Sequence, residues 1–534
     1  MIRSTRIGGL LAVVASTLAL ALPGVTTASA STAAKGTSGP STKTLHMAFN
    51  ADMQVPDPDI FYEVEGNEVV TSAYEGLVRY KPNSAQVEGA LATSWTVSAD
   101  GLTYTFKLRP NVKFQTGGTE DASSWIASFK RRVDLGSVSA PGYMLAQVAS
   151  TSAPDPLTFV VTLKEPVSAF LDYLAAPYGP KAVDPAVVAA HDENGDLAQN
   201  WLKAHSAGTG PYYISKFDVG SDYVLTRNDN WWGNPKPYFQ TVDISIVPEI
   251  ATQRLKLESG DLDLLTHGLP VADVDSFKSN PKFQVKQFPV LLKTVLASNP
   301  NKGIFKDPAM RSALTTFFDK KEIVGEVYKG QATVSTQMYP VKELPPNLGR
   351  DVGKYDPSKL TKLAAKASDK NIDLGYSEDE GGTLPRLAEI LAAKLQAVGF
   401  NVKVRGLPIA QVFDLPNKPD QAPDLLLWTF NPDAAHPDTW VRIFMNKSGS
   451  INYLQCSDPN ADAAMDAGLK ATSAADVQAQ YGKAGDILAK TGCYVTLADV
   501  KEEVVARKGL TGFVHQLPTA YTVRLADLKE SSAP

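Results

Sequence analysis

The spacing of apolar residues along the chain predicts strands and helices in alternation. A period of two, which is typical of strands, marks several short segments of the first half. The predicted strands are Thr44–Phe49, Thr103–Leu108, Asp155–Lys164, Tyr212–Phe217, Tyr223–Arg227 and Thr241–Pro248. Helical spacing marks Asn67–Val78, Ala122–Val133 and Ile250–Ser259. This alternation indicates α/β domains.

The second half contains a predicted βαβ unit. A strand over Ile372–Tyr376 is followed by an amphipathic helix over Leu384–Val398 and a strand over Phe400–Val404. Asp424–Thr429 is nearly all apolar, which favours a buried parallel strand. Near Leu291–Asn299 the chain is expected to cross into another domain. Further helices are predicted over Pro308–Phe318, Asp319–Tyr328, Asp458–Leu469 and Ala475–Leu488, and a strand over Tyr494–Leu497.

Composition sets limits on the class of protein. A chain of 534 residues is longer than a single hydrophobic core usually supports, so two or three domains are expected. Its 43% hydrophobic and 20% charged residues are ordinary for a globular protein. A net charge of -5, without any run of Lys and Arg, argues against a nucleic-acid partner.

The amino terminus has the pattern of a signal peptide. Arg3 and Arg6 precede an apolar segment, Ile7–Leu22, and Ala28-Ser-Ala30 predicts cleavage after Ala30. We interpret residues 31–42, rich in Ser, Thr, Gly and Ala, as a flexible leader. No cysteine follows the apolar segment to carry a lipid. The mature protein is therefore expected outside the cell membrane, as an extracellular or cell-envelope protein in a space equivalent to the periplasm.

The chain has two cysteines, Cys456 and Cys493. In an exported protein an even number of cysteines favours a disulfide, although two separate buried thiols remain the alternative. The six histidines are scattered without the spacing of metal ligands, so no metal site is expected. No nucleophile elbow or phosphate-binding glycine loop is present, and no catalytic residue is predicted.

One segment, Gly208–Gly233, predicts a hairpin that ends in Asn-Asp-Asn-Trp-Trp-Gly. We interpret Trp231 and Trp232 as packing residues. This segment closely resembles the central signature of the extracellular solute-binding proteins, family 5, of peptide- and nickel-type ABC importers. Five further segments resemble that family in the same order along the chain: Tyr74–Tyr80, Leu91–Phe114, Leu257–Asp263, Phe305–Leu314 and Asp319–Val324.

The resemblance implies an α/β fold of two lobes, of the periplasmic-binding-protein type II with an extra domain. Mixed sheets flanked by helices would form the lobes, and the ligand cleft would lie between them. The boundaries that it implies are residues 43–75, 206–288 and 504–534 for lobe I, 76–205 for its extra domain, and 289–503 for lobe II.

The implied function is capture of a short peptide or similar solute, followed by delivery to the membrane permease subunits of an ABC importer when the lobes close. Such a protein is a monomer, needs no cofactor and is not an enzyme.

The resemblance also indicates where the solute would bind. Peptide-binding members commonly carry an acidic residue three positions after a tryptophan at a strand end, where it pairs with the peptide amine. Here Asn431 stands at that position after Trp428, and Asp433, two residues on, is a possible substitute. The predicted solute-binding residues are Asn50, Met53, Gln54, Trp428, Phe430, Asn431 and Asp433.

Two alternatives remain open at this point. Because Asn431 carries no charge, the same scaffold could bind a non-peptide ligand such as a metal chelate or an oligosaccharide. A protein of another class, a secreted hydrolase with two carboxylates in a cleft, is the second alternative, although no distinctive carboxylate motif supports it.

Overall fold

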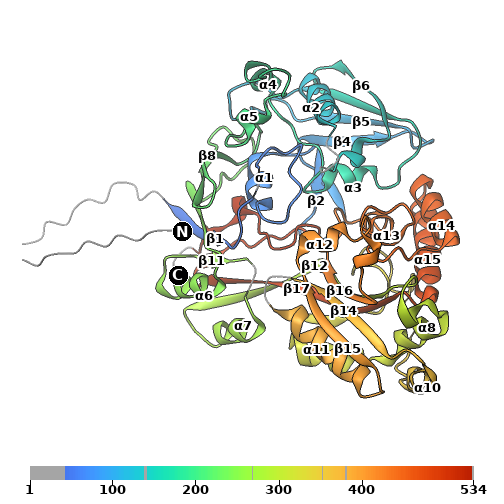
Figure 1. Ribbon diagram of the computed structural model, residues 1–534. Helices are drawn as coiled ribbons and strands as arrows, with labels where there is room; N and C mark the ends of the chain where they lie inside the picture. The colour runs from blue at the N-terminus through green and yellow to red at the C-terminus, as the bar shows by residue number, and fades with distance from the viewer. Residues whose placement is uncertain are drawn as a thin grey trace, which may run out of the picture. The chain divides into compact units, whose positions relative to one another are not determined.

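The computed structural model describes residues 43–53, 55–136, 141–266, 269–350, 353–378 and 382–531. The predicted signal peptide and leader lie outside these residues. Residues Thr42–Pro534 belong to one unit, and the account below concerns this unit alone. It contains both helices and sheets, as the spacing of apolar residues predicts (Figure 1).

The first sheet has the strand order β1-β10-β9-β8. Strand β1 (Thr44–Phe49) is parallel to β10 (Thr241–Ile246), and the other pairs are antiparallel. The predicted hairpin is confirmed, with strands β8 (Tyr212–Asp218) and β9 (Asp222–Arg227).

Helix α1 (Asn67–Ala73) is shorter than predicted, because the chain becomes extended at Tyr74. Strand β2 (Val78–Tyr80) then pairs with β3 (Val87–Gly89). Glu75, in the expected last turn, instead accepts hydrogen bonds from both Trp231 and Trp232. Tertiary contacts thus override the helical pattern here.

The tryptophan pair packs against a glycine-containing turn. The Nε1 groups of Trp231 and Trp232 donate to Glu75 at 3.2 and 2.9 Å. A Cβ atom on Gly233 would come within 2.1 Å of the Trp231 ring, so only glycine fits beside that ring. This placement agrees with the interpretation of the pair as packing residues.

A second sheet of four strands has the order β4-β5-β7-β6. Its strands are β4 (Ala92–Val97), β5 (Thr103–Leu108), β7 (Thr158–Leu163) and β6 (Val148–Asp155). Helix α2 (Ala122–Leu135) contacts β6 and β7, and its Trp125 and Phe129 rings meet Phe159. Short helices follow: η1 (Gly142–Leu145), α3 (Phe170–Ala175), α4 (Pro185–Ala190) and α5 (Gln199–Leu202).

The largest sheet has seven strands, ordered β11-β17-β12-β16-β14-β15, with β13 also paired to β17. Its strands are β11 (Leu264–Leu265), β12 (Phe283–Ser298), β13 (Ala332–Val334), β14 (Asn371–Ser377), β15 (Asn401–Leu407), β16 (Leu425–Phe430) and β17 (Tyr494–Arg507). The predicted βαβ unit is confirmed, since β14 and β15 are parallel and joined through α11 (Thr383–Gln396). Strand β16 is parallel to β14, as predicted, and antiparallel to β12.

Two long strands, β12 and β17, pair over most of their length (Figure 1). The sequence predicted only the apolar start of β17, Tyr494–Leu497, as a strand, and it marked Leu291–Asn299, at the end of β12, only as an expected crossing between domains. The rest of β12 includes the exposed polar residues Lys286 and Gln287, which interrupt the apolar pattern.

Helices cover both faces of this sheet, and each face has its own apolar core. One core includes residues of α13 (Asp438–Met445), α14 (Pro459–Lys470) and α15 (Ala474–Thr491). The other includes residues of α8 (Pro308–Phe317), α9 (Lys320–Tyr328), α10 (Ser358–Lys366) and α11. The remaining elements are α6 (Ile250–Ser259), α7 (Val271–Lys278), α12 (Ile409–Asp414), η2 (Gly303–Lys306), η3 (Pro419–Gln421), β18 (Leu510–Thr511), η4 (Leu525–Asp527) and β19 (Lys529–Glu530).

A buried carboxyl group next to α2 gives the fold a pH dependence. Burial raises the pKa of Glu120 to about 7, although a hydrogen bond from the Trp125 indole opposes the rise. Between about pH 4.5 and 7 the folded protein holds a proton that the unfolded chain has lost. This group therefore lowers the free energy of unfolding as the pH rises through that window.

Replacing this group by an amide, Glu120→Gln, removes the ionisation and keeps an oxygen to accept the indole hydrogen bond. We expect the variant to be more stable than the parent at pH 8, by on the order of 1–3 kcal/mol, and equally stable near pH 4. Thermal unfolding followed by circular dichroism at both pH values measures this. Glu193→Gln, at an exposed position, is the control. An equal effect at both pH values would contradict the assignment.

Candidate functional site

Asp433 lies in the segment between β16 and α13, where it meets two tyrosines from the amino-terminal part of the chain. Tyr62 donates to its Oδ2 atom at 2.8 Å, and Tyr143 donates to the same atom at 2.6 Å. Tyr62 follows the loop after β1, and Tyr143 belongs to η1. Three segments far apart in sequence therefore meet at one carboxyl group.

This carboxyl group is strongly desolvated. Asp433 is 8% exposed, and burial raises its pKa, while the hydrogen bonds from Tyr143 and Tyr62 oppose part of that rise. Both hydroxyls donate to Oδ2, and no described residue donates to Oδ1. A group that brought a positive charge to Oδ1 would favour the ionised carboxylate.

A cavity of about 640 Å³ lies beside the tyrosines, and its size is within the usual range for small-molecule sites. We call it the tyrosine cavity. It is lined by the end of α2, by η1 and by the first turns of α13, and its lining includes Tyr62, Arg132, Tyr143, Tyr173, Asp438 and Arg442.

At its α13 side the cavity is fixed by a buried ion pair. Asp438 accepts from Arg442 Nε at 2.8 and 3.0 Å, and from the hydroxyls of Tyr481 at 2.6 Å and Tyr173 at 3.3 Å. Burial raises the pKa of Asp438, and the charge of Arg442 works against that rise. Asp438 also stands in the first turn of α13, where the helix dipole favours a negative charge.

At its α2 side the cavity is lined by Arg132. Its Nη1 atom is 3.6 Å from Asp59 Oδ1, and its Nη2 atom donates to the carbonyl of Tyr178. The Nε and Nη1 atoms are buried, and no described residue accepts a hydrogen bond from them. Burial lowers the pKa of this guanidinium, against the attraction of Asp59.

The other predicted residues near β16 have different surroundings. Trp428 is 1% exposed, and its ring packs against Phe444 and Trp440 in the core. Phe430 is partly buried and stacks on Phe444. Asn431 is partly buried too, and its amide donates to the carbonyl oxygens of Pro432 and Pro518, at 3.1 and 3.3 Å.

The predicted residues after β1 are placed as follows. Met53 is buried, and its backbone N–H donates to the Tyr223 hydroxyl at 3.2 Å. Asn50 is partly buried, and its Oδ1 atom has no hydrogen-bond partner among the described residues. Gln54 lies outside the described residues. Among the predicted residues that the structure describes, Asp433 alone is bonded directly to lining residues of the tyrosine cavity.

Several residues of this site were not predicted from the sequence. Tyr62 and Tyr143 stand outside every motif, and only long-range packing brings them to Asp433. A signal did exist for α13, where Asp438 and Arg442 are spaced four residues apart, which is typical of a helical ion pair.

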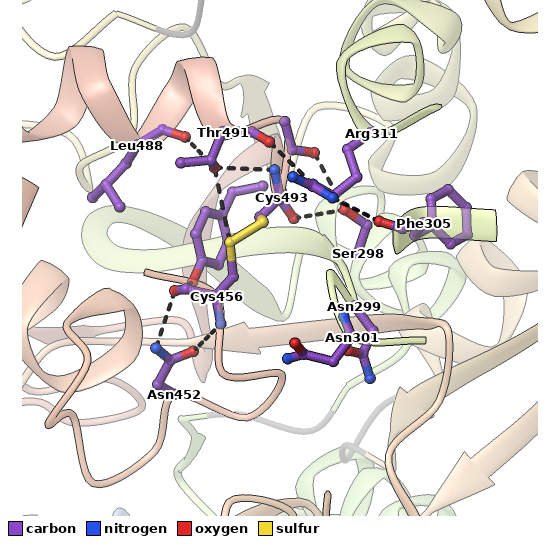
Figure 2. The surroundings of a disulfide bond; sticks show 12 residues. Ser298, Asn299, Asn301, Phe305, Arg311, Asn452, Cys456, Leu488, Thr491 and Cys493 are labelled. Carbon is purple, nitrogen blue, oxygen red and sulfur yellow. Dashed lines mark hydrogen bonds between the residues drawn. A yellow bond between two sulfur atoms is a disulfide. The ribbon is translucent and has the colours of Figure 1, made fainter. Parts of the chain in front are cut away.

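The predicted disulfide is confirmed, and it joins Cys456 to Cys493. Figure 2 shows the bond with its neighbours: Asn452 bonds both the N–H and the carbonyl of Cys456, at 3.1 and 3.0 Å, and the Thr491 hydroxyl accepts from the N–H of Cys493 at 3.1 Å. The bond closes a loop that contains α14 and α15. The disulfide therefore has a structural role in this part of the chain.

The described residues contain no group of three or more His, Cys, Asp and Glu side chains arranged to hold a metal ion. Within the same residues, every helix is too short or too polar to cross a bilayer.

Known proteins with similar structures have this fold. The ABC transporter-associated periplasmic binding protein DppA from Helicobacter pylori, in complex with the peptide STSA, has a TM-score of 0.77 at 22% identity, covering 92% of this chain and 98% of that one. NikA from Brucella suis in complex with Fe(III)-EDTA has a TM-score of 0.78 at 23% identity, covering 91% and 100%. The predicted α/β, two-lobed fold of periplasmic binding proteins is thereby confirmed.

Sequence comparisons agree with the fold. The chain is 28% identical over 487 residues to the probable D,D-dipeptide-binding periplasmic protein DdpA of Escherichia coli strain K12, covering 87% of this chain and 90% of that protein. The family model described as bacterial extracellular solute-binding proteins, family 5 Middle, matches residues 86–452. Because this match spans more than half of the chain, the protein belongs to the bacterial extracellular solute-binding proteins of family 5.

Proposed function

We propose that this protein is exported and captures a short peptide or a similar amine-bearing solute outside the cell membrane. It then delivers the solute to the permease subunits of an ABC importer. The observation that supports the choice of ligand most directly is the buried Asp433 carboxyl group, whose Oδ1 atom accepts no hydrogen bond from a described residue. A buried carboxylate gains from a charged amine, because the pair forms a charge-assisted hydrogen bond.

The position of Asp433 supports a role in closure. Asp433 follows β16 of the seven-stranded sheet, whereas Tyr62 and Tyr143 belong to the amino-terminal part of the chain. A solute that contacted both groups would stabilise the conformation in which they are close together. The transporter would then recognise this closed conformation, and no covalent chemistry is needed.

The test is the variant Asp433→Asn, which keeps an oxygen to accept the tyrosine hydroxyls. We expect the affinity for an amine-bearing peptide to fall at least about tenfold, the effect of losing one charge-assisted hydrogen bond. Screening a peptide library by thermal shift identifies a ligand, and isothermal titration calorimetry then compares the variants. Asp420→Asn, which removes a charge at an exposed position, should leave the affinity unchanged. Equal affinity of Asp433→Asn and the parent would place the amine elsewhere.

A second candidate ligand is a carboxylate-bearing metal chelate. Arg132 supports it, because this buried guanidinium lines the tyrosine cavity and has two nitrogens without hydrogen bonds to described residues. The structurally similar NikA was crystallised with Fe(III)-EDTA. A thermal shift with Fe(III)-EDTA that Arg132→Gln abolishes, together with no response to peptides, would favour the chelate.

A further inference from the structure

A second cavity, also of about 640 Å³, is lined in part by the segment that follows Asp433. Residues Ala435, His436 and Pro437 line this cavity, whereas Asp438 and Thr439 line the tyrosine cavity. Its remaining walls come from the turn between β4 and β5, from the start of α3, and from the turn between α14 and α15. Two acidic side chains, Asp172 and Glu343, line it, and we call it the acidic cavity.

Glu343 is the unusual residue of this cavity. Its side chain is 9% exposed, and both carboxyl oxygens are buried without a hydrogen-bond partner among the described residues. A buried carboxyl group with no partner is costly, so its retention in a folded protein suggests a partner from outside the chain.

The positive charge that attracts Glu343 is already paired with another carboxyl group. Lys293 on β12 attracts Glu343, but its ammonium is 2.6 Å from Asp499 on β17 and also bonds the Ser335 hydroxyl. Asp172 on α3 adds a further acidic group, and its Oδ1 atom accepts from the Tyr80 hydroxyl at 2.9 Å.

The charges around the acidic cavity therefore do not balance. Glu343 is repelled by two further carboxyl groups, those of Asp172 and Asp499, and attracted by one ammonium, that of Lys293. His436 adds no positive charge near neutral pH, because burial lowers its pKa to about 3. Burial raises the pKa of Asp172 to about 7 and that of Glu343 well above its ordinary value. Bound protons therefore neutralise part of the negative charge.

We propose that the acidic cavity is a binding site for a small organic cation, an alkylammonium or guanidinium group held between Asp172 and Glu343. A cation there would replace the protons on both carboxyl groups and supply the hydrogen bonds that Glu343 lacks. The polar residues Ser168, Ser473 and Gln478 line the same cavity and are suited to the rest of such a molecule. This site does not depend on the proposed role of Asp433.

Binding of 1,4-diaminobutane and agmatine, measured by calorimetry, tests the proposal, with 1,4-butanediol as the neutral counterpart. We expect the parent to bind both cations and not the diol. We also expect the affinity to increase from pH 6 to pH 8, as the carboxyl groups ionise. Glu343→Gln and Asp172→Asn should each reduce the affinity at least about tenfold, since each removes one charge-assisted hydrogen bond. Asp100→Asn, an exposed acid beside the lining residues Ala99 and Gly101, should not change it.

Thermal unfolding of each variant provides the folding control. Both amide variants lose a desolvated acid, so their melting temperatures should equal or exceed that of the parent at pH 8. The proposal is overturned if the parent binds neither cation, if the diol binds as well as the diamine, or if a variant that combines Glu343→Gln with Asp172→Asn keeps the affinity of the parent. Loss of cation binding in Asp433→Asn but not in Glu343→Gln would also overturn it, because the cation would then occupy the tyrosine cavity.

Discussion

Replacing Arg131 with methionine is expected to lower the free energy of unfolding by about 3–5 kcal/mol, the usual cost of removing one partner from a buried ion pair. Arg131 lies on α2 with its side chain 3% exposed. Its guanidinium contacts Asp57 at 2.6 and 2.8 Å, and Asp59 at 2.6 Å. Both acids are almost fully buried, so the variant would leave Asp57 without its cation and Asp59 with only Arg132, whose Nη1 atom is 3.6 Å away.

The same variant should also weaken solute binding. The loop that Arg131 holds leads directly into Tyr62, which donates to Asp433. Chemical denaturation measures the stability, and calorimetry measures the affinity. The control is Lys130→Met, one position earlier on α2, where the side chain is 71% exposed and its pair with Asp134 should contribute less than about 1 kcal/mol. Equal stability of the two variants would contradict the assigned role of Arg131.

Removing the disulfide by Cys456→Ala with Cys493→Ala is expected to lower the free energy of unfolding by about 4 kcal/mol. The bond joins positions 37 residues apart, and the loss of loop entropy in the unfolded chain gives this magnitude. Alanine suits both positions, because the cysteines are 4% and 0% exposed. Reduction of the parent should produce the same loss, since the chain has no other cysteine.

Denaturation with and without a reducing agent checks this result. The double alanine variant should not respond to the reducing agent, which makes it the matched control. Titration of two free thiols in the oxidised, folded parent would contradict the bond.

Much of the fold could be predicted because its apolar patterns are local. The βαβ unit of β14, α11 and β15 and the hairpin of β8 and β9 were predicted almost to their ends. The pattern failed where burial depends on distant segments. Strands β12 and β17 contain polar residues among their apolar ones. Helix α1 ends early, because Glu75 accepts hydrogen bonds from two tryptophans that are distant in sequence.

The site was harder to predict than the fold, for the same reason. Asp433 could be predicted as a binding residue because it follows the end of a strand and because Asn431 stands where the family resemblance implies an acidic residue. Its partners Tyr62 and Tyr143 lie 371 and 290 residues away in sequence. The buried imbalance of charge around Glu343 depends on three further segments, so no local pattern could indicate it.

The central claim is that Asp433 binds the charged amine of the captured solute. The most direct measurement compares a peptide ligand with its N-acetylated form, on the parent and on Asp433→Asn, by calorimetry. We expect acetylation to weaken binding to the parent at least about tenfold and to have little further effect on the variant, because both changes remove the same interaction. Equal losses on the two proteins would contradict the claim and show that the amine is bound by another group.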